Sequence, residues 1–403
     1  MSTLPILTVR PGEADRIIAG HPWLYANSLF PPAKPVPDGA LVQVMDTRHR
    51  DLGTGLYNSK SKIAVRMLGH DVAKLDAAFF EERIRAALEV RRRHMAGATC
   101  CRVVNAEADF LSGLIVDRYE DVLVMQTSAL GMDQRKADIV AALQTVLAPR
   151  AILERSETAA RKFEGLGESS GVLAGECDGN VTVKLNGLAF AANLLTGHKT
   201  GLYLDQQVNY QRVADLVAMR PGAQVLDAFT FLGGFALHAA RAGAAHVLGL
   251  DRSEEALASA SANAAANRLD SKCAFEAVNV FDWLKAQTVA PPHEKFIPRW
   301  DAIILDPPSF TRNRESVPNA LRGYKEIHVR ALKLLRPGGV LATFCCSHHV
   351  SAGVFMDTVL SAAFDQRRIL RRVAVLGPSP DHPVIPMIPE TEYLKGFTFE
   401  VVR

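Results

Sequence analysis

Residues 225–251 read VLDAFTFLGGFALHAARAGAAHVLGLD, a pattern typical of a βαβ nucleotide-binding unit. The apolar residues 225–226 suit a buried parallel strand, and the apolar run at 247–250 suits its neighbour in the same sheet. Between them, Gly233 and Gly234 allow a tight turn with close backbone approach, and residues 235–241 have helix-forming composition. The sequence therefore predicts a doubly wound, Rossmann-like α/β domain.

The polar residues of this unit indicate its ligand. The spacing GxGxxG of dinucleotide-binding folds is missing because both glycines come late in the turn, so a pyrophosphate fits poorly. Asp227 directly follows the first strand, where a carboxylate would repel a pyrophosphate and attract an ammonium. Asp251 ends the next strand 18 positions after Gly233, near the offset at which an acid reaches ribose hydroxyls. S-adenosylmethionine (SAM) carries both groups, and we interpret the unit as a SAM site.

Later strands of the same domain end in residues that can carry chemistry. The third strand is expected at 273–277 with a polar tip at 279–282, and the fourth, at 301–305, stops at Asp306-Pro307-Pro308. Two prolines end strand pairing and fix the backbone, so the Asp306 carboxylate is expected at the carboxyl edge of the sheet. Ligands of open α/β sheets bind at that edge. Base methyltransferases use such a turn, with an aromatic nearby, to hold a planar base.

A cysteine nucleophile is expected at Cys345-Cys346, at the end of a fifth strand at 340–344 that follows a helix at 325–335. Strand periodicity places Cys346 on the face of Phe344 and Cys345 on the opposite face, so one thiol faces the site. Carbon 5 of a pyrimidine is too weak a nucleophile to take a methyl group from SAM. A thiolate that adds to carbon 6 makes the ring an enamine, and its later elimination restores base and enzyme. Buried, inert cysteines are the alternative interpretation, but the SAM unit and the Asp-Pro-Pro turn favour catalysis.

Length and composition limit the other classes of function. The chain has 403 residues, which predicts two or three domains, and its 48% hydrophobic content supports globular cores. Its apolar runs are too short for a membrane span and no signal segment opens the chain, so a cytoplasmic location is expected. The six cysteines include no CxxC pair, and His348 and His349 lack acids at ligand spacing. No disulfide framework and no metal site are predicted.

The first 72 residues predict a small β-rich domain. Strand patterns at 7–9, 40–45, 52–57 and 63–68 alternate with Pro and Gly turns. Residues 1–95 carry 14 Lys and Arg against 10 Asp and Glu, which suits an RNA substrate and also an ordinary solvated surface. His21, Trp23 and Tyr25 are candidates for stacking on bases or riboses, but a core role is the favoured interpretation for Trp23 and Tyr25. Candidate phosphate contacts on the loops are Arg48, His49, Arg50, Lys60 and Lys62.

The middle of the chain predicts an α+β domain, a linker and a lid. Helical spacing at 77–96 and 134–147 alternates with strand patterns at 101–105, 114–117, 122–127 and 151–155. The Gly-, Ser- and acid-rich residues 165–180 are expected to form a loop or linker. A hairpin is predicted around Asn186-Gly187, and the polar residues 196–207 suggest a lid before a helix at 208–219. The expected domains are 1–72, 73–180 and 181–403.

Taken in order, the motifs of the chain resemble those of the bacterial 23S ribosomal RNA cytosine-C5 methyltransferases that carry an amino-terminal PUA domain. The resemblance covers nearly the full length. The motifs that carry it are HPWLY at 21–25, RSE at 155–157, RKFEGL at 161–166, GHKTGLYLDQ at 197–206, DAFTFLGGF at 227–235, DPPSF at 306–310, RGYK at 322–325, TFCCS at 343–347, DHPVI at 381–385 and YLKGF at 393–397.

This resemblance implies a PUA domain, a middle α+β domain and a class I SAM-dependent methyltransferase domain. The implied reaction is methylation of carbon 5 of a cytosine in 23S rRNA, with Cys346 as the nucleophile. Asp306 would hold the cytosine edge at ring N3 and the amino group. The SAM site implied at the matching positions comprises Tyr203, Asp205, Gln206, Asp227, Phe229, Gly233, Asp251, Asn279 and Asp306.

Three positions depart from the family's pattern. Gln207 stands where the family usually has Arg, which removes a contact of the lid. Asn279 replaces an Asp often placed against the adenine amino group, and its side-chain oxygen can still accept that hydrogen bond. Ser309 follows the Asp-Pro-Pro turn where many RNA cytosine methyltransferases have a second cysteine that helps release product.

Two other functions fit the same residues. A methyltransferase acting on another base position, such as the guanine amino group, would use the Asp-Pro-Pro turn without Cys346. A ribosome-assembly or RNA-binding factor would have a SAM site without turnover. The expected partner is RNA, either 23S rRNA or a large-subunit assembly intermediate, and no membrane is expected. An exposed edge strand would permit a homodimer, which no pattern in the sequence demands.

Overall fold

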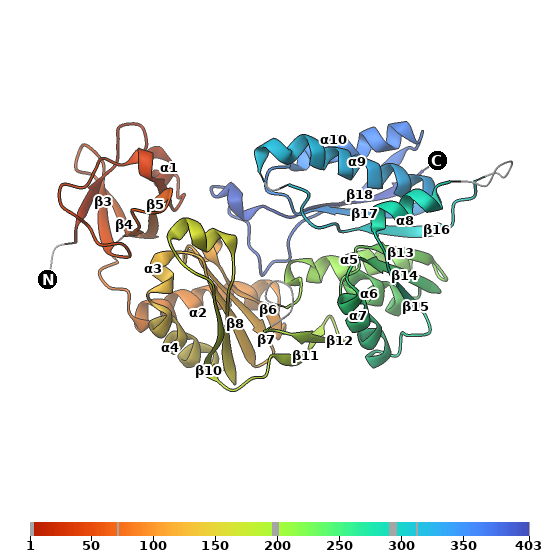
Figure 1. Cartoon of the computed structure of the whole chain (residues 1–403), viewed down its shortest axis with the longest axis horizontal. Helices are drawn as coiled ribbons and strands as arrows, with labels where there is room; N and C mark the ends of the chain where they lie inside the picture. Colours follow the sequence, from red (N-terminus) through yellow and green to blue (C-terminus); the bar gives the residue numbers. More distant parts are fainter. Residues whose placement is uncertain (1–3, 71, 196–200, 290–295, 312, 403) are drawn as a thin grey trace. The chain divides into compact units, whose positions relative to one another are not determined.

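The structure is a computed structural model that describes residues 4–70, 72–195, 201–289, 296–311 and 313–402 (Figure 1). The chain forms two compact units. The first comprises residues 1–181, 192–204 and 380–391, and the second comprises residues 182–191, 205–379 and 392–403. The chain thus enters the second unit and returns to the first near its end, which the sequence patterns did not predict. No helix in the described ranges is long and apolar enough to cross a membrane.

The first unit begins with a five-stranded sheet, as the sequence predicts for its β-rich part. Alternating side chains of its strands, among them Leu7, Val42, Val44 and Val65, are buried in one apolar cluster. The sheet has the order β1-β3-β4-β5-β2, and one short helix, α1, accompanies it. The bounds are β1 Ile6–Thr8, α1 Asp15–Ile18, β2 Trp23–Tyr25, β3 Leu41–Met45, β4 Asp51–Tyr57 and β5 Ile63–Gly69.

A second five-stranded sheet, of order β10-β9-β8-β7-β6, completes the first unit. The strand pair β8/β9 is parallel and the other pairs are antiparallel, so this is the expected mixed α/β middle domain. Apolar residues of α2 and α4, such as Phe80, Ile84, Ile139 and Leu143, are buried in its core. The bounds are α2 Ala77–His94, β6 Cys100–Asn105, β7 Leu114–Tyr119, β8 Val122–Thr127, α3 Leu130–Asp133, α4 Lys136–Leu147, β9 Ala151–Ser156, η3 Ala159–Glu164 and β10 Ser169–Gly175.

The prediction of a loop or linker over residues 165–180 is wrong. Ser169–Gly175 pairs antiparallel with Ala151–Ser156 as the edge strand β10. Its sequence, SSGVLAG, has little apolar alternation, and none of its residues is fully buried. The strand is therefore set by hydrogen bonds to β9 rather than by its own propensity, a contribution that local composition does not show.

The DHPVI segment joins the carboxyl-terminal part of the chain to the middle domain within the first unit. Arg91 of α2 is buried, donates to both carboxylate oxygens of Asp109 at 2.6 and 2.8 Å, and donates to the Asp381 carbonyl at 2.7 Å. The Asp381 carboxylate accepts from the Arg102 backbone N–H at 2.8 Å. The family motif at 381–385 therefore has a structural role here, and Arg91 is part of this network rather than a solvated cation.

The second unit contains a seven-stranded sheet of order β15-β14-β13-β16-β17-β19-β18. Strands β13 to β17 are parallel, whereas β19 pairs antiparallel with both β17 and β18. Helices α5, α6 and α7 cover one face and α8, α9 and α10 cover the other, which confirms the doubly wound fold (Figure 1). The bounds are α5 Gln207–Ala218, β13 Gln224–Ala228, α6 Gly234–Arg241, β14 His246–Asp251, α7 Glu254–Ala266, β15 Cys273–Ala277, α8 Val280–Gln287, β16 Trp300–Leu305, α9 Val317–Leu334, β17 Leu335–Cys345, α10 Ala352–Asp365, β18 Leu370–Leu376 and β19 Lys395–Val401.

Two details of this sheet differ from the sequence prediction. The polar tip expected at 279–282 is the start of helix α8, because the Asn279 side chain caps the helix by accepting from the Phe281 N–H at 3.0 Å. Helix α9 begins at Val317 rather than at 325, with Pro318 in its first turn. The predicted hairpin is confirmed as β11 (Asn180–Leu185) and β12 (Leu188–Asn193), with Asn186 and Gly187 at φ 50° and 84°.

Candidate active site

Asp227 lies at the carboxyl end of β13 and is fully buried. Its Oδ2 atom accepts from Thr230 Oγ1 at 2.6 Å and from the Ala236 backbone N–H at 3.0 Å. Its Oδ1 atom is buried without a hydrogen-bond partner among the described residues. Burial raises the pKa of Asp227 to about 7 against these two hydrogen bonds, and Asp251 adds to the rise. A buried carboxylate oxygen without a donor is suited to receive a cationic ligand group.

The turn after β13 is held in a strained backbone conformation. Phe229 and Phe231 have φ of 74° and 51°, uncommon for bulky residues, and Gly233 has φ of 86°. The backbone N–H groups of Phe229 and Thr230 both donate to the Leu250 carbonyl, at 2.9 and 2.8 Å. The turn is therefore held to the end of β14 by hydrogen bonds. Glycine is favoured at 233 because its φ of 86° would strain any other side chain and because a Cβ there would lie 2.6 Å from Leu237 Cδ1.

Asp251 connects the first two loops of the sheet edge. Its Oδ2 accepts from the Phe231 N–H at 2.9 Å and its Oδ1 accepts from the Ser253 N–H at 3.0 Å. Asn279, which the resemblance assigns to the adenine, lies in the next loop. Its side-chain oxygen caps α8 by accepting a hydrogen bond from the Phe281 N–H. Phe229 and Phe281 make an edge contact between these loops, with ring centroids 6.5 Å apart.

Asp306 meets the beginning of α5 at the same sheet edge. Its Oδ2 accepts from Gln206 Nε2 at 3.0 Å, and Gln206 Oε1 accepts from Asn209 Nδ2 at 2.7 Å. Asp205 accepts from the Tyr393 hydroxyl at 2.6 Å. The structure thus brings Asp205, Gln206 and Asp306 to one place.

The remaining residues of the expected lid are placed as follows. Tyr203 is half-buried and lies near the end of residues 192–204, the second segment of the first unit. The residues at 196–200 lie outside the described residues. Gln207 is buried in the first turn of α5, where its Oε1 has no hydrogen-bond partner among the described residues.

The adjacent cysteines differ in environment. Cys345 is fully buried in the apolar core of the second unit. Cys346 is half-buried, and its Sγ lies 3.9 Å from the Pro307 carbonyl of the Asp-Pro-Pro turn. Next to it, Ser347 Oγ lies 3.0 Å from Ser309 Oγ and 3.2 Å from the Tyr324 hydroxyl. The thiol and the turn that carries Asp306 are therefore neighbours, as strand ends of one sheet edge should be.

Lys395 is a residue of this region that the sequence reading did not single out. It is 6% exposed and pairs with Cys345 across the β17/β19 ladder. Its Nζ donates to the carbonyls of Ser347 and Tyr393, both at 2.8 Å. Burial lowers the pKa of Lys395, and the nearby Cys345 and Cys346 thiols oppose that effect. An isolated Lys in the apolar strand KGFTFEV was the signal available in the sequence.

The amino-terminal aromatics are neither core residues nor free for stacking. Trp23 is half-buried, and its Nε1 donates to Glu107 and Ser112 of the middle domain at 3.0 and 3.3 Å. The Tyr25 ring lies under the Arg16 guanidinium, 5.2 Å away. The favoured interpretation of both as core residues is thus wrong for Trp23, which joins two sheets of the first unit.

The loop cations remain at the surface. Arg48, His49, Arg50, Lys60 and Lys62 are all exposed. Arg50 pairs with Asp46 at 3.1 Å. Within the described ranges, no three His, Cys, Asp or Glu side chains are arranged to hold a metal ion.

Comparisons with known proteins match the whole chain. Residues 7–70 match the PUA-like domain family and residues 162–385 match the S-adenosylmethionine-dependent methyltransferase family. The chain is 37% identical to Ribosomal RNA large subunit methyltransferase I of Pseudoalteromonas atlantica, over 98% of this chain and 99% of the relative. It is 34% identical to the protein of the same name from Citrobacter koseri, over 98% and 99%.

Solved structures of related fold cover the same length. A Streptococcus mutans protein described as a SAM-dependent methyltransferase aligns with a TM-score of 0.81 at 22% identity, over 98% of this chain and 100% of that chain. A methyltransferase solved in complex with S-adenosylhomocysteine aligns with a TM-score of 0.82 at 23% identity, over the same shares. At these identities the likeness shows a shared fold.

Proposed function

The chain belongs to the ribosomal RNA large subunit methyltransferase I family of SAM-dependent methyltransferases, and from this premise we propose that it methylates carbon 5 of a cytosine in 23S rRNA. One observation carries the choice of carbon 5. The half-buried Cys346 thiol lies 3.9 Å from the Pro307 carbonyl, directly beside Asp306. Methylation of an exocyclic amino group needs the Asp-Pro-Pro turn but gives no role to a thiol at that point.

The residues at the sheet edge fit SAM. The buried Asp227 Oδ1 atom is suited to the ammonium of its amino-acid part, and Asp251 at the end of β14 is suited to its ribose hydroxyls. We assign the rest of the cofactor site to the other residues that the resemblance implies: Tyr203, Asp205, Gln206, Phe229, Gly233, Asn279 and Asp306. Bound SAM would supply an electrophilic methyl group to the base.

The residues of the chain itself then perform three tasks. Asp306 holds the cytosine at ring N3 and the amino group, which fixes the ring beside the thiol. The Cys346 sulfur forms a bond to carbon 6, which makes carbon 5 nucleophilic and places the electron pair where the methyl group is accepted. Once carbon 5 is methylated it loses its proton to a base, and the carbon 6–sulfur bond breaks to restore the aromatic ring and the free thiolate.

We further propose that Lys395 supports this role of Cys346 electrostatically. Its buried ammonium is fixed on the carbonyl of Ser347, the residue that follows the nucleophile. A positive charge in a desolvated site stabilises a nearby thiolate. The variant Lys395→Met should slow alkylation of Cys346 by iodoacetamide about tenfold, the effect of ~1.4 kcal/mol of lost charge stabilisation. If the melting temperature falls while the alkylation rate stays the same, Lys395 is a structural residue only.

The test of the function is bisulfite sequencing of 23S rRNA from a deletion strain complemented with variants. Wild type and Cys345→Ala should restore one methylated cytosine, whereas Cys346→Ala should leave it unmethylated while binding SAM normally. Cytosine methylation restored by Cys346→Ala would mean that carbon 5 is methylated without this thiol as the nucleophile. Unchanged cytosine methylation in the deletion strain itself would favour a reaction at another base or a non-catalytic RNA-binding factor.

The organisation of the chain is part of the proposal. We assign residues 1–72 to an RNA-binding PUA-like domain, 73–180 to the middle domain and 181–403 to the methyltransferase domain. The substrate is 23S rRNA or an assembly intermediate that contains it, and the protein works in the cytoplasm, where this RNA is made. A homodimer through the edge strand β18 is a further expectation, which sedimentation of the purified protein would test.

A further inference from the structure

We propose that Phe163, Lys162, Lys60 and Lys62 form a docking patch for a single-stranded segment of the RNA substrate, here called the Phe163 patch. A base would stack on the Phe163 ring, and the three ammonium groups would contact the neighbouring phosphates. The inference rests on the proposed RNA substrate and adds the place where that RNA is held. It lies in the first unit and uses none of the residues assigned to SAM or to Cys346.

Phe163 is an apolar side chain held out in solvent by its neighbours. It is 69% exposed, in the short helix η3 between β9 and β10. The flanking residues Arg161 and Glu164 are each only 3% exposed. Arg161 donates to the Thr127 carbonyl and to Asp133, both at 2.7 Å, and to the Gly167 carbonyl at 2.6 Å. An exposed ring between two anchored charges is preorganised, so binding a base costs little ordering entropy.

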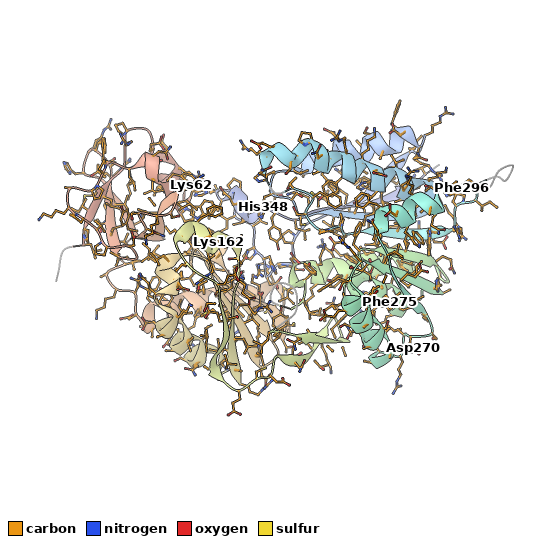
Figure 2. The ribbon with its side chains drawn as sticks, viewed as in Figure 1. Lys62, Lys162, Asp270, Phe275, Phe296 and His348 are labelled. Carbon is orange, nitrogen blue, oxygen red and sulfur yellow. The ribbon has the colours of Figure 1, made fainter. Side chains whose placement is uncertain are left out.

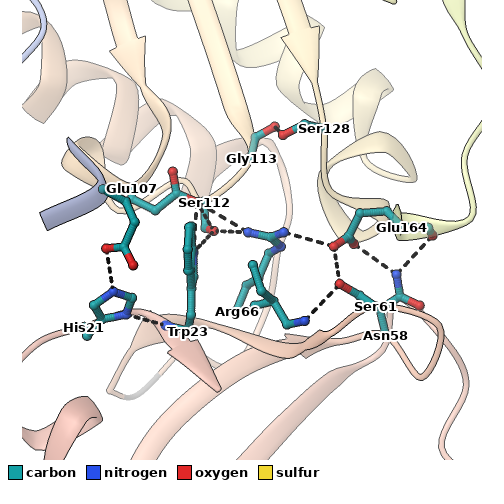
Figure 3. A network of polar contacts seen from close by, with 12 residues as sticks. His21, Trp23, Asn58, Ser61, Arg66, Glu107, Ser112, Gly113, Ser128 and Glu164 are labelled. Carbon is teal, nitrogen blue, oxygen red and sulfur yellow. Dashed lines mark hydrogen bonds and ion pairs between the residues drawn. The ribbon is translucent and has the colours of Figure 1, made fainter. Parts of the chain in front are cut away.

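The turn after β4 is built in the same way and meets η3. Asn58 and Ser61 are buried, whereas Lys60 and Lys62 between and beside them are exposed. Glu164 accepts from Ser61 Oγ at 2.5 Å and from Asn58 Nδ2 at 3.0 Å (Figure 3). Hydrogen bonds between buried polar residues thus hold these two turns, which belong to different sheets, against each other. The exposed side chains of both turns point into solvent.

The negative charge of Glu164, which links the two turns, is compensated by Arg66. Burial would raise the pKa of Glu164, but Arg66 and the hydrogen bonds from Ser61 and Asn58 hold that pKa below its ordinary value. Arg66 Nη2 donates to Glu164 at 2.9 Å. The carboxylate of Glu164 therefore does not cancel the lysines outside it. Of the exposed ionisable groups on these two turns, Lys60, Lys62 and Lys162 outweigh the exposed Glu168.

Lys60 lies close to the loop that carries Phe163. A Cβ atom on Gly165 would be 3.0 Å from Lys60 Cδ and 4.0 Å from its Nζ, so the Lys60 ammonium lies over the end of η3. Lys62 and Lys162 are labelled on the facing turns in Figure 2. A ring with cations beside it matches a nucleotide, which offers a planar base and a phosphate. A protein partner would not need three exposed ammonium groups on the two turns that flank this ring.

The aromatic rings of Trp23 and His21, near the amino terminus, are not available for stacking on a base. Trp23 is occupied by its hydrogen bonds to Glu107 and Ser112, and His21 is 3% exposed with its Nε2 at 3.0 Å from Glu390. Neither ring can receive a base without breaking this network (Figure 3). Phe163, by contrast, is 69% exposed and lies next in sequence to Lys162.

The first experiment measures RNA affinity in the full-length Cys346→Ala protein, so that the result is independent of the methylation chemistry. The probe is a fluorescein-labelled oligouridylate of about 16 nucleotides, followed by anisotropy. Phe163→Ala should weaken binding about tenfold, within the range for loss of one stacked base. The matched control is Phe364→Ala, which removes an 82% exposed ring from the second unit and should leave affinity unchanged.

The charge contribution is measured by the salt dependence of the same binding. Replacing Lys60, Lys62 and Lys162 by Gln should reduce the slope of log K against log salt by about 2, or about 0.7 for each phosphate contact. The control is Lys34→Gln, which removes an exposed lysine of the amino-terminal β-rich domain and should leave the slope unchanged.

The second experiment reports on stacking directly. In Phe163→Trp, RNA should quench the added tryptophan fluorescence, and in Phe364→Trp it should not. Equal affinity of Phe163→Ala and wild type, together with unquenched Phe163→Trp fluorescence, overturns the proposal and leaves the ring as a contact for a protein. Methylation by Cys346→Ala would overturn the proposed mechanism and would leave the RNA-binding result untouched, so the two proposals fail separately.

Discussion

Asp227 should make SAM binding depend on pH in a range where most carboxylates do not titrate. In the ligand-free protein, burial raises the pKa of Asp227 to about 7, so the ionised form is disfavoured and the carboxylate is half protonated at neutral pH. The SAM ammonium binds the ionised form, and its own pKa, near 8, keeps it charged below pH 7. Affinity must therefore fall as the pH falls through 7.

The expected magnitude follows from the fraction of ionised carboxylate. Half of the Asp227 side chains are ionised at pH 7 and about 1% at pH 5, so the Kd for SAM should rise about 50-fold, or ~2.3 kcal/mol. Isothermal titration calorimetry of the purified protein measures this. The control ligand is 5′-methylthioadenosine, which has the nucleoside but no ammonium and should bind equally at both pH values.

Two results would refute the reasoning about Asp227. A SAM affinity that stays constant between pH 7 and pH 5 means that the buried carboxylate does not receive the ammonium. An equal loss for 5′-methylthioadenosine means that acid distorts the site as a whole. The variant Asp227→Asn should bind SAM weakly with no change over this range, because no titrating carboxylate remains.

Two predictions concern stability. Arg66→Ala leaves the buried Glu164 carboxylate without its guanidinium partner and should lower the free energy of urea unfolding by ~3 kcal/mol. The control Arg85→Ala removes an exposed ion pair and should lower it by under ~0.5 kcal/mol. If the two variants unfold alike, the contact of Figure 3 does not hold the two sheets of the first unit together. Burial lowers the pKa of His238 and His328 to about 4, so their stabilising neutral state is complete above pH 6.5 and is lost towards pH 4. Each should contribute ~3 kcal/mol over that window, and an unfolding midpoint that is flat between pH 6.5 and pH 4 would contradict this.

The doubly wound domain could be predicted from the sequence because its residue patterns have local physical causes. Parallel strands buried on both faces leave continuous apolar runs, and the glycine at 233 has a steric cause that the structure shows. The approach of Cys346 to the Asp-Pro-Pro turn followed from a rule of topology, since the carboxyl ends of neighbouring parallel strands share an edge. Those inferences needed no knowledge of distant contacts.

The errors occurred where distant contacts decide the local structure. Ser169–Gly175 forms a strand because β9 offers hydrogen bonds, and its composition alone resembles a linker. Trp23 looked like a core residue because its partners Glu107 and Ser112 come some 85 positions later in the chain. Lys395 had only the weak signal of one cation in an apolar strand. Its partners are backbone carbonyls, which no residue pattern reveals.

The central claim, a covalent bond between Cys346 and carbon 6 of cytosine, is tested most directly by trapping that bond. In 23S rRNA transcribed with 5-fluorocytidine, fluorine replaces the proton that must leave carbon 5, so the methylated adduct cannot be resolved. With SAM present, wild type and Cys345→Ala should form an RNA–protein complex that resists denaturing electrophoresis, and peptide mass spectrometry should find the nucleotide on Cys346. No adduct with wild type on RNA that it methylates in unsubstituted form, or an equal adduct with Cys346→Ala, would contradict the claim.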